Sequence, residues 1–109
     1  MKFTRLLCNG MEQPLGYDFH HSRLTWVVDS PHRDDGQVAY RLEVALEPSF
    51  AATVYDSGRT TSDQTAQVPL PLDLDPCTRY YWRVTVWSRG EATPATSPVT
   101  WFETARYAL

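Results

Sequence analysis

Residues 74–87, LDPCTRYYWRVTVW, decide the fold predicted for this chain. The second half of the stretch alternates with a period of two, which is the pattern of a β-strand with one buried face. One parity holds Tyr80, Trp82, Val84 and Val86, and the other holds Tyr81, Arg83, Thr85 and Trp87. We therefore expect a long strand that places the first set in a core and the second set on an outer surface.

The first half of the stretch has the residues of a corner that leads into this strand. Pro76 fixes φ and removes a backbone donor, so residues 74–76 read as a turn. The spacing Leu74-x-Pro76-x-Thr78-x-Tyr80 resembles the tyrosine corner of immunoglobulin-like and fibronectin type III sandwiches. In such a corner the tyrosine hydroxyl hydrogen-bonds to backbone a few residues upstream. Leu74, Pro76 and Tyr80 are thus predicted to form a structural corner, which indicates a scaffold and not a reaction.

Strand-like runs separated by turn signals continue through the rest of the chain, without a capped helical pattern. Besides the stretch above, we expect strands at residues 3–8, 22–28, 37–46, 53–55, 65–70 and 99–104. Residues 13–16 and 94–98 are predicted to be a turn and a polar loop, and residues 47–52 a loop or a single helical turn. About seven strands predict an all-β sandwich of the fibronectin type III or immunoglobulin type.

Length and charge limit the function classes. The chain has 109 residues, which is one domain with one core, and its net charge of −3 gives no basic surface for nucleic acid or membrane. The first residues lack the apolar run of a signal peptide, so a cytoplasmic location is expected.

Cys8 and Cys77 do not occupy the positions of an antibody-type disulfide, and we expect two free thiols.

Six motifs in a fixed order resemble a more specific family. They are the segments 13–16 (QPLG), 24–26 (LTW), 39–45 (AYRLEVA), 55–58 (YDSG), 79–87 (RYYWRVTVW) and 101–104 (WFET). This succession resembles the N-terminal fibronectin type III-like domain of bacterial α-L-rhamnosidases, which are large multidomain glycoside hydrolases. Gln13, where the family often has Asn or Glu, and the pair His20-His21 depart from the family pattern.

The resemblance implies a non-catalytic accessory domain of a larger enzyme. In that family, inverting hydrolysis of terminal α-L-rhamnosides by paired acidic residues belongs to a later helical (α/α)6 barrel domain. That barrel is not in this chain, so the resemblance transfers no catalytic residue. It implies that the partners are other domains of the same polypeptide.

Clusters that could carry chemistry are weak. The carboxylates Asp34, Asp35, Asp56, Asp73 and Asp75 fall in predicted turns, where Asp is a common turn residue. Adjacent His20 and His21 point to opposite sides of an extended chain and have no cysteine pair at zinc spacing. We therefore predict no catalytic residue, no metal site and no cofactor.

The surface predicted to carry function is the outward parity of the long strand together with its neighbours. If strands 37–46, 74–87 and 99–104 lie side by side, one patch forms from Arg41, Glu43, Tyr81, Arg83, Trp87 and Trp101. Exposed aromatic and arginine side chains on one sheet favour contact with a partner. Three interpretations are open: docking against a neighbouring domain, carbohydrate binding on aromatic platforms, or a Trp87 or Trp101 covered by a loop of this domain.

Overall fold

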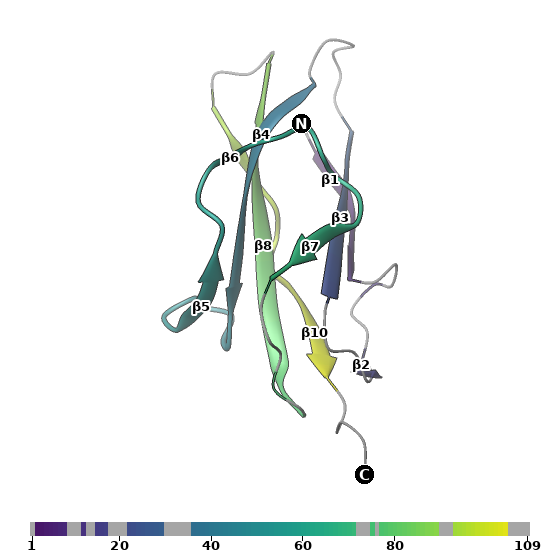
Figure 1. Ribbon diagram of the computed structural model, residues 1–109, viewed down its shortest axis with the longest axis vertical. Coiled ribbons are helices and arrows are strands. Elements are labelled where there is room, and N and C mark those ends of the chain that lie inside the picture. The colour runs from purple at the N-terminus through teal and green to yellow at the C-terminus, as the bar shows by residue number, and fades with distance from the viewer. Residues whose placement is uncertain are drawn as a thin grey trace.

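The chain forms two β-layers packed face to face, as seen in the computed structural model (Figure 1). The structure describes residues 2–8, 12, 15–17, 22–29, 36–71, 75, 77–89 and 93–104. All regular elements in these residues are strands. The predicted all-β sandwich is therefore confirmed.

The smaller layer has three strands in the order β1-β3-β7. They are β1 (Lys2–Cys8), β3 (Ser22–Asp29) and β7 (Val68–Leu70), and both pairs are antiparallel. Pro69 lies in β7 at the edge of this sheet, where a missing backbone donor is tolerated.

The larger layer is built around β8 (Arg79–Ser88), the strand predicted first. Its order is β2 (Leu15–Tyr17), β10 (Thr100–Thr104), β8, β4 (Gln37–Ala45) and β5 (Thr53–Asp56). The short strands β6 (Thr60–Thr61) and β9 (Ala95–Thr96) add to β4 and β8. β2 runs parallel to β10, and the remaining pairs are antiparallel. β4, β8 and β10 are thus neighbours, as the predicted patch requires.

The core lies between the two layers and contains the inward parity of β8. Tyr80, Trp82, Val84 and Val86 are all buried, and each alternates with a half-buried neighbour. Leu24 and Trp26 of β3 reach this core from the smaller sheet, and further buried residues are Leu42, Val44, Val68, Leu70 and Phe102. A period-two pattern of large apolar residues was therefore sufficient to identify the core face.

A partly buried polar bridge joins the two sheets beside this apolar core. Trp26 Nε1 donates to Gln37 Oε1 at 2.9 Å, and Gln37 Nε2 donates to the carbonyl oxygens of Ser62 and Gln64, each at 2.9 Å. Trp26 is almost completely buried, so its indole donor needs this acceptor. Gln37 therefore connects β3, β4 and the segment that leads to β7.

Four short segments differ from the predictions, and one of them is β6 at Thr60–Thr61, where no strand was predicted. Residues 15–17 form β2 where a turn was predicted, and residues 95–96 form β9 where a polar loop was predicted. The strand predicted at 65–70 begins only at Val68, because Gln67 has φ of 55° and its amide donates to Thr25 Oγ1 at 2.9 Å. Strands of two or three residues depend on hydrogen bonding to distant partners, so periodicity does not predict them.

Candidate functional site

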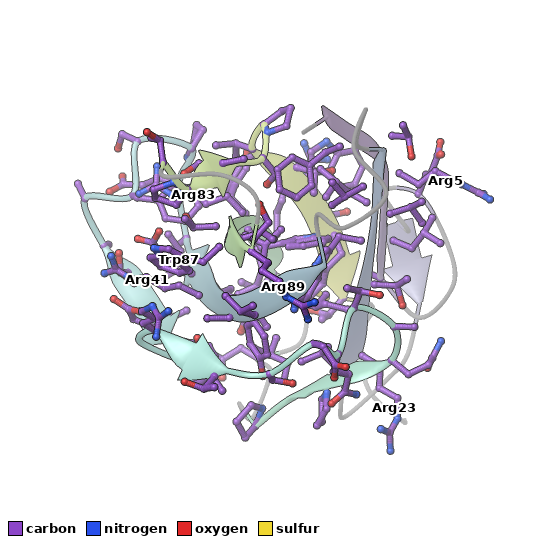
Figure 2. All side chains as sticks on the ribbon, turned by 90° about the horizontal axis from the view of Figure 1, so that it is seen from above. Arg5, Arg23, Arg41, Arg83, Trp87 and Arg89 are labelled. Carbon is purple, nitrogen blue, oxygen red and sulfur yellow. The ribbon has the colours of Figure 1, made fainter. Side chains whose placement is uncertain are left out.

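The predicted patch forms on the outer face of the larger sheet. Glu43 lies opposite Arg83, Ala39 opposite Trp87, and Tyr81 opposite Trp101. Seen from above, Arg41, Arg83 and Trp87 gather on one side of the molecule, while Arg5 and Arg23 lie on the opposite side (Figure 2). We call this surface the outer face and define it as Arg41, Glu43, Phe50, Asp56, Arg59, Arg79, Tyr81, Arg83, Trp87, Trp101 and Glu103.

A bidentate ion pair occupies the centre of the outer face. Arg83 Nε and Nη2 donate to Glu43 Oε1 and Oε2, both at 3.1 Å. Glu43 retains 9% of its accessible surface, so its carboxylate is largely removed from water. Bidentate geometry of this kind is the favourable way to hold a buried carboxylate. The pair therefore fixes the side chains at the sheet centre.

A second ion pair links β4 to the edge strand β5. Arg41 Nε donates to Asp56 Oδ1 at 2.9 Å, and Arg41 Nη2 lies 4.0 Å from Glu43 Oε2. The hydrogen bond from Arg41 is the main reason that the pKa of Asp56 falls from 3.8 to about 2. Burial acts in the opposite direction, and the Gly58 amide adds to the lowering. The same pair raises the pKa of the Arg41 guanidinium.

Arginine guanidinium groups cover three aromatic rings of the outer face. The Cζ atom of Arg79 lies 4.1 Å from the centroid of Trp101, and that of Arg83 lies 4.2 Å from the centroid of Phe50. Arg59 lies over Trp87 at 5.2 Å. These distances are in the range of cation–π contacts. One face of each ring is thereby occupied by a side chain of this domain.

The aromatic side chains also lie beside wholly buried alanines. Ala39 and Ala45 are 0% exposed although they have the outward parity, and they lie opposite Trp87 and Tyr81. A methyl side chain on one strand leaves room for a large ring from the next strand to lie across it. Tyr81, Trp87 and Trp101 are consequently half-buried. Side chains of the domain's own strands thus contribute to the burial of Trp87 and Tyr81, and the three interpretations of the patch stay open.

Sequence reasoning missed five members of the outer face. Arg79 and Glu103, which pair at 3.3 Å, share the parity of residues already chosen on β8 and β10, so the alternation could have found them. Asp56 and Arg59 flank the Ser57-Gly58 turn, and their contacts depend on how that turn packs. Phe50 lies in a loop and has φ of 58°, and no sequence signal predicts its position over the sheet.

The corner at the start of β8 contains the hydrogen bond that the sequence suggested. The Asp75 amide donates to Tyr80 Oη at 2.8 Å, while Leu74 and Pro76 lie outside the described residues. Burial raises the pKa of Tyr80. Thr104 Oγ1 donates to the Asp75 carbonyl at 2.6 Å and accepts from the Thr78 amide at 3.0 Å. The corner is thus joined both to its own strand and to the end of β10.

Among the described residues, the potential metal ligands and the two cysteines form neither a metal site nor a disulfide. No group of three His, Cys, Asp or Glu side chains in the described ranges is placed to hold a metal ion. Asp34, Asp35, Asp73 and all three histidines lie outside these ranges. Cys8 is buried and Cys77 is exposed, and no disulfide joins these two described residues. Within the same ranges, no helix has the length and apolar character needed to span a membrane.

A shallow groove lies apart from the outer face, beside the edge strand β1. It is lined by Phe3, Leu6, Pro98, Thr100 and their neighbours, and its volume is about 290 Å³. The charged residues in its lining are Arg5 and Glu12, whose side chains are 3.9 Å apart and well exposed. An exposed pair at this distance contributes little to stability. The hydroxyl of Thr4, which also lines the groove, donates to the Val27 carbonyl at 3.2 Å.

Comparison with known families identifies the domain. The model of the family described as Rha78A-like, N-terminal immunoglobulin domain, matches residues 3–108. The chain belongs to this family. The family assignment agrees with the resemblance seen in the six motifs.

Relatives of this immunoglobulin domain are α-L-rhamnosidases. A protein of that name from Streptomyces avermitilis is 36% identical over 97 residues, which cover 86% of this chain and 9% of the relative. Another from Formosa agariphila is 25% identical over 95 residues, covering 83% of this chain and 10% of the relative. The chain thus spans about a tenth of the length of these relatives.

Solved structures agree with this assignment. The α-L-rhamnosidase of Streptomyces avermitilis, solved in complex with L-rhamnose, superposes with a TM-score of 0.88 at 33% identity, over 95% of this chain and 10% of that one. The α-L-rhamnosidase of "Dictyoglumus thermophilum" gives a TM-score of 0.81 at 25% identity, over 96% of this chain and 12% of that one. The immunoglobulin domain is therefore a small part of each larger chain that it resembles.

Proposed function

We propose that this domain is the non-catalytic accessory domain of an α-L-rhamnosidase and packs against other domains of the same polypeptide through its outer face. One observation carries the proposal: most of this chain matches α-L-rhamnosidases, yet it accounts for only 9% and 10% of the relatives' length. Among the described residues, no group of His, Cys, Asp and Glu side chains is placed to hold a metal ion. Hydrolysis is thus assigned to the rest of the polypeptide.

The composition of the outer face supports docking. Arginine, tryptophan, tyrosine and phenylalanine are enriched at the centres of protein interfaces, whereas lysine is depleted there. The outer face contains four arginines, two tryptophans, one tyrosine and one phenylalanine among its defining residues. Its ion pairs and ring contacts already hold these side chains in place, so little conformational entropy is lost when a partner covers them.

Carbohydrate binding is the less favoured function for the same surface. A sugar platform needs an accessible aromatic ring face, and guanidinium groups lie over the rings of Trp87 and Trp101. Tyr81 lacks such a cover among the described contacts, but it is half-buried. The geometry therefore favours a protein partner over a sugar.

The experiment compares the 109-residue chain with the polypeptide that carries it and its further domains. Turnover of an aryl α-L-rhamnoside is expected for the longer polypeptide and not for the 109-residue chain. Hydroxyl-radical footprinting of both should show slower oxidation of Tyr81 and Trp101 in the longer polypeptide, because docking covers them. Turnover by the 109-residue chain, or equal oxidation in both proteins, would contradict the proposal.

A further inference from the structure

Arg59 differs from the other arginines of the outer face in its charge partners. Arg41, Arg79 and Arg83 each form an ion pair with a carboxylate of this domain. In the described part of the chain, no carboxylate forms an ion pair with Arg59, whose side chain is exposed. Its charge is therefore available to a group outside the domain.

The backbone that presents Arg59 is fixed to the neighbouring strand. Ser57 N donates to the Leu42 carbonyl at 2.9 Å, and Leu42 N donates to Ser57 Oγ at 2.8 Å. Asp56 Oδ1 accepts from Gly58 N at 2.9 Å, and Gly58 has φ of 66°, which favours glycine there. The turn of the Tyr-Asp-Ser-Gly motif thus holds residue 59 in a defined place beside β4.

The Arg59 head group is held as well. Its Cζ atom lies 5.2 Å from the centroid of Trp87, within the range of a cation–π contact. A cation–π contact leaves the N–H donors of a guanidinium unused, and the Arg59 side chain is exposed. A pre-oriented guanidinium of this kind matches the two oxygens of a carboxylate.

The charge balance of the outer face points to the same partner chemistry. Its defining residues include Arg41, Arg59, Arg79 and Arg83 but three carboxylates, Glu43, Asp56 and Glu103, in a chain of net charge −3. The single positive charge in excess on this face is that of Arg59 itself, because the other three arginines pair with the three carboxylates. Such a surface favours an acidic partner over a basic one.

We propose that Arg59, stacked on Trp87, binds an aspartate or glutamate carboxylate on the partner domain. The inference rests on the proposed docking through the outer face and names the partner's chemistry at one point of it. The carboxylate accepts two hydrogen bonds from the Arg59 guanidinium, while the other arginines keep their internal partners.

The test uses the polypeptide that carries this domain and its further domains, with Arg59→Gln as the main variant. Arg5→Gln is the matched control, because Arg5 is exposed on the opposite side of the molecule (Figure 2). For each variant, footprinting measures the oxidation rates of Tyr81 and Trp101 in both proteins. The protection ratio is the rate in the 109-residue chain divided by the rate in the longer polypeptide. Using this ratio removes any change that the variant makes within the domain itself.

We expect Arg59→Gln to weaken docking about tenfold, as seen in a lower protection ratio, and Arg5→Gln to leave the ratio unchanged. Arg59→Lys should fall between them, since it keeps the charge but loses the planar fork. Protection in the unsubstituted protein should also decrease with added salt, and less so in Arg59→Gln. An unchanged ratio in Arg59→Gln, with the outer face still protected, would overturn this inference and leave the proposed function standing. If Tyr81 and Trp101 are unprotected even without a substitution, docking through the outer face is itself wrong.

Discussion

The hydroxyl oxygen of Tyr80 accepts a hydrogen bond from the backbone amide of Asp75, five residues earlier, at 2.8 Å. This bond closes the corner at the start of β8, and Thr104 joins the same corner to the end of β10. The two strands that frame the outer face are therefore held together at one end by side-chain contacts.

Tyr80→Phe removes this acceptor and tests the corner. We expect the free energy of unfolding to fall by roughly 0.5–1.5 kcal/mol, because one intramolecular hydrogen bond is lost. The value should lie toward the lower end, since Asp75 is exposed and water can reach its amide. Urea denaturation measures the change. An unchanged midpoint would show that the bond does not stabilise the fold.

The Glu43–Arg83 pair is expected to behave as a coupled unit. Arg83→Met leaves a largely buried carboxylate with Arg41 as its more distant partner, at 4.0 Å, and should destabilise the domain by about 1–3 kcal/mol. The double variant Glu43→Leu/Arg83→Met removes both charges and should recover much of that loss. A double-mutant cycle measured by chemical denaturation gives the coupling energy. If the changes in unfolding free energy of the single variants add up to that of the double variant, Glu43 and Arg83 are not coupled.

Acid should weaken the domain in part through Asp56. Its folded-state pKa of about 2 lies below the ordinary value of 3.8, so folding favours the ionised form. The stabilisation is therefore fully present above the unfolded-state pKa and is lost as the pH falls from 3.8 to about 2. Asp56→Asn should flatten the pH dependence of stability in this window, as measured by thermal unfolding at several pH values. The exposed residue Asp63 provides the control, and Asp63→Asn should retain the dependence seen without substitution.

Gln37→Leu tests the polar bridge between the sheets. The substitution leaves the buried Trp26 Nε1 donor without its acceptor and should reduce the free energy of unfolding by about 1–3 kcal/mol. Gln64→Leu is the matched control, because the Gln64 side chain is exposed and bonds only to nearby backbone. Its effect should stay within about 0.5 kcal/mol. If chemical denaturation shows equal losses of unfolding free energy in the two variants, the Gln37 side chain stabilises the fold no more than an exposed glutamine does.

Titration of the domain with L-rhamnose separates docking from sugar binding. We expect no saturable change in tryptophan fluorescence, because arginines cover the rings of Trp87 and Trp101. Saturable binding that disappears in Trp87→Ala or Trp101→Ala would favour the carbohydrate-binding function instead.

The sequence alone determined the inward face of β8 and the three central strands of the outer face, whereas the burial of Ala45, which has the outward parity, was not predicted. The alternation in β8 separates Trp82 from Arg83 without any knowledge of neighbours, since a strand places successive side chains on opposite sides. The same pattern in β4 placed Arg41 and Glu43 on the outer side, and the ordered motifs indicated the family.

Only the tertiary structure decided how the outer face is connected. The contacts of Arg59 with Trp87, Arg83 with Phe50, and Arg41 with Asp56 join residues from loops and edges to the central strands. Their geometry depends on turns with positive φ and on register between strands far apart in the chain, which no local pattern records. For that reason the sequence predicted a patch of arginines and aromatic residues, whereas the structure showed that Arg59 alone among the four arginines has no carboxylate partner within the described part of the chain.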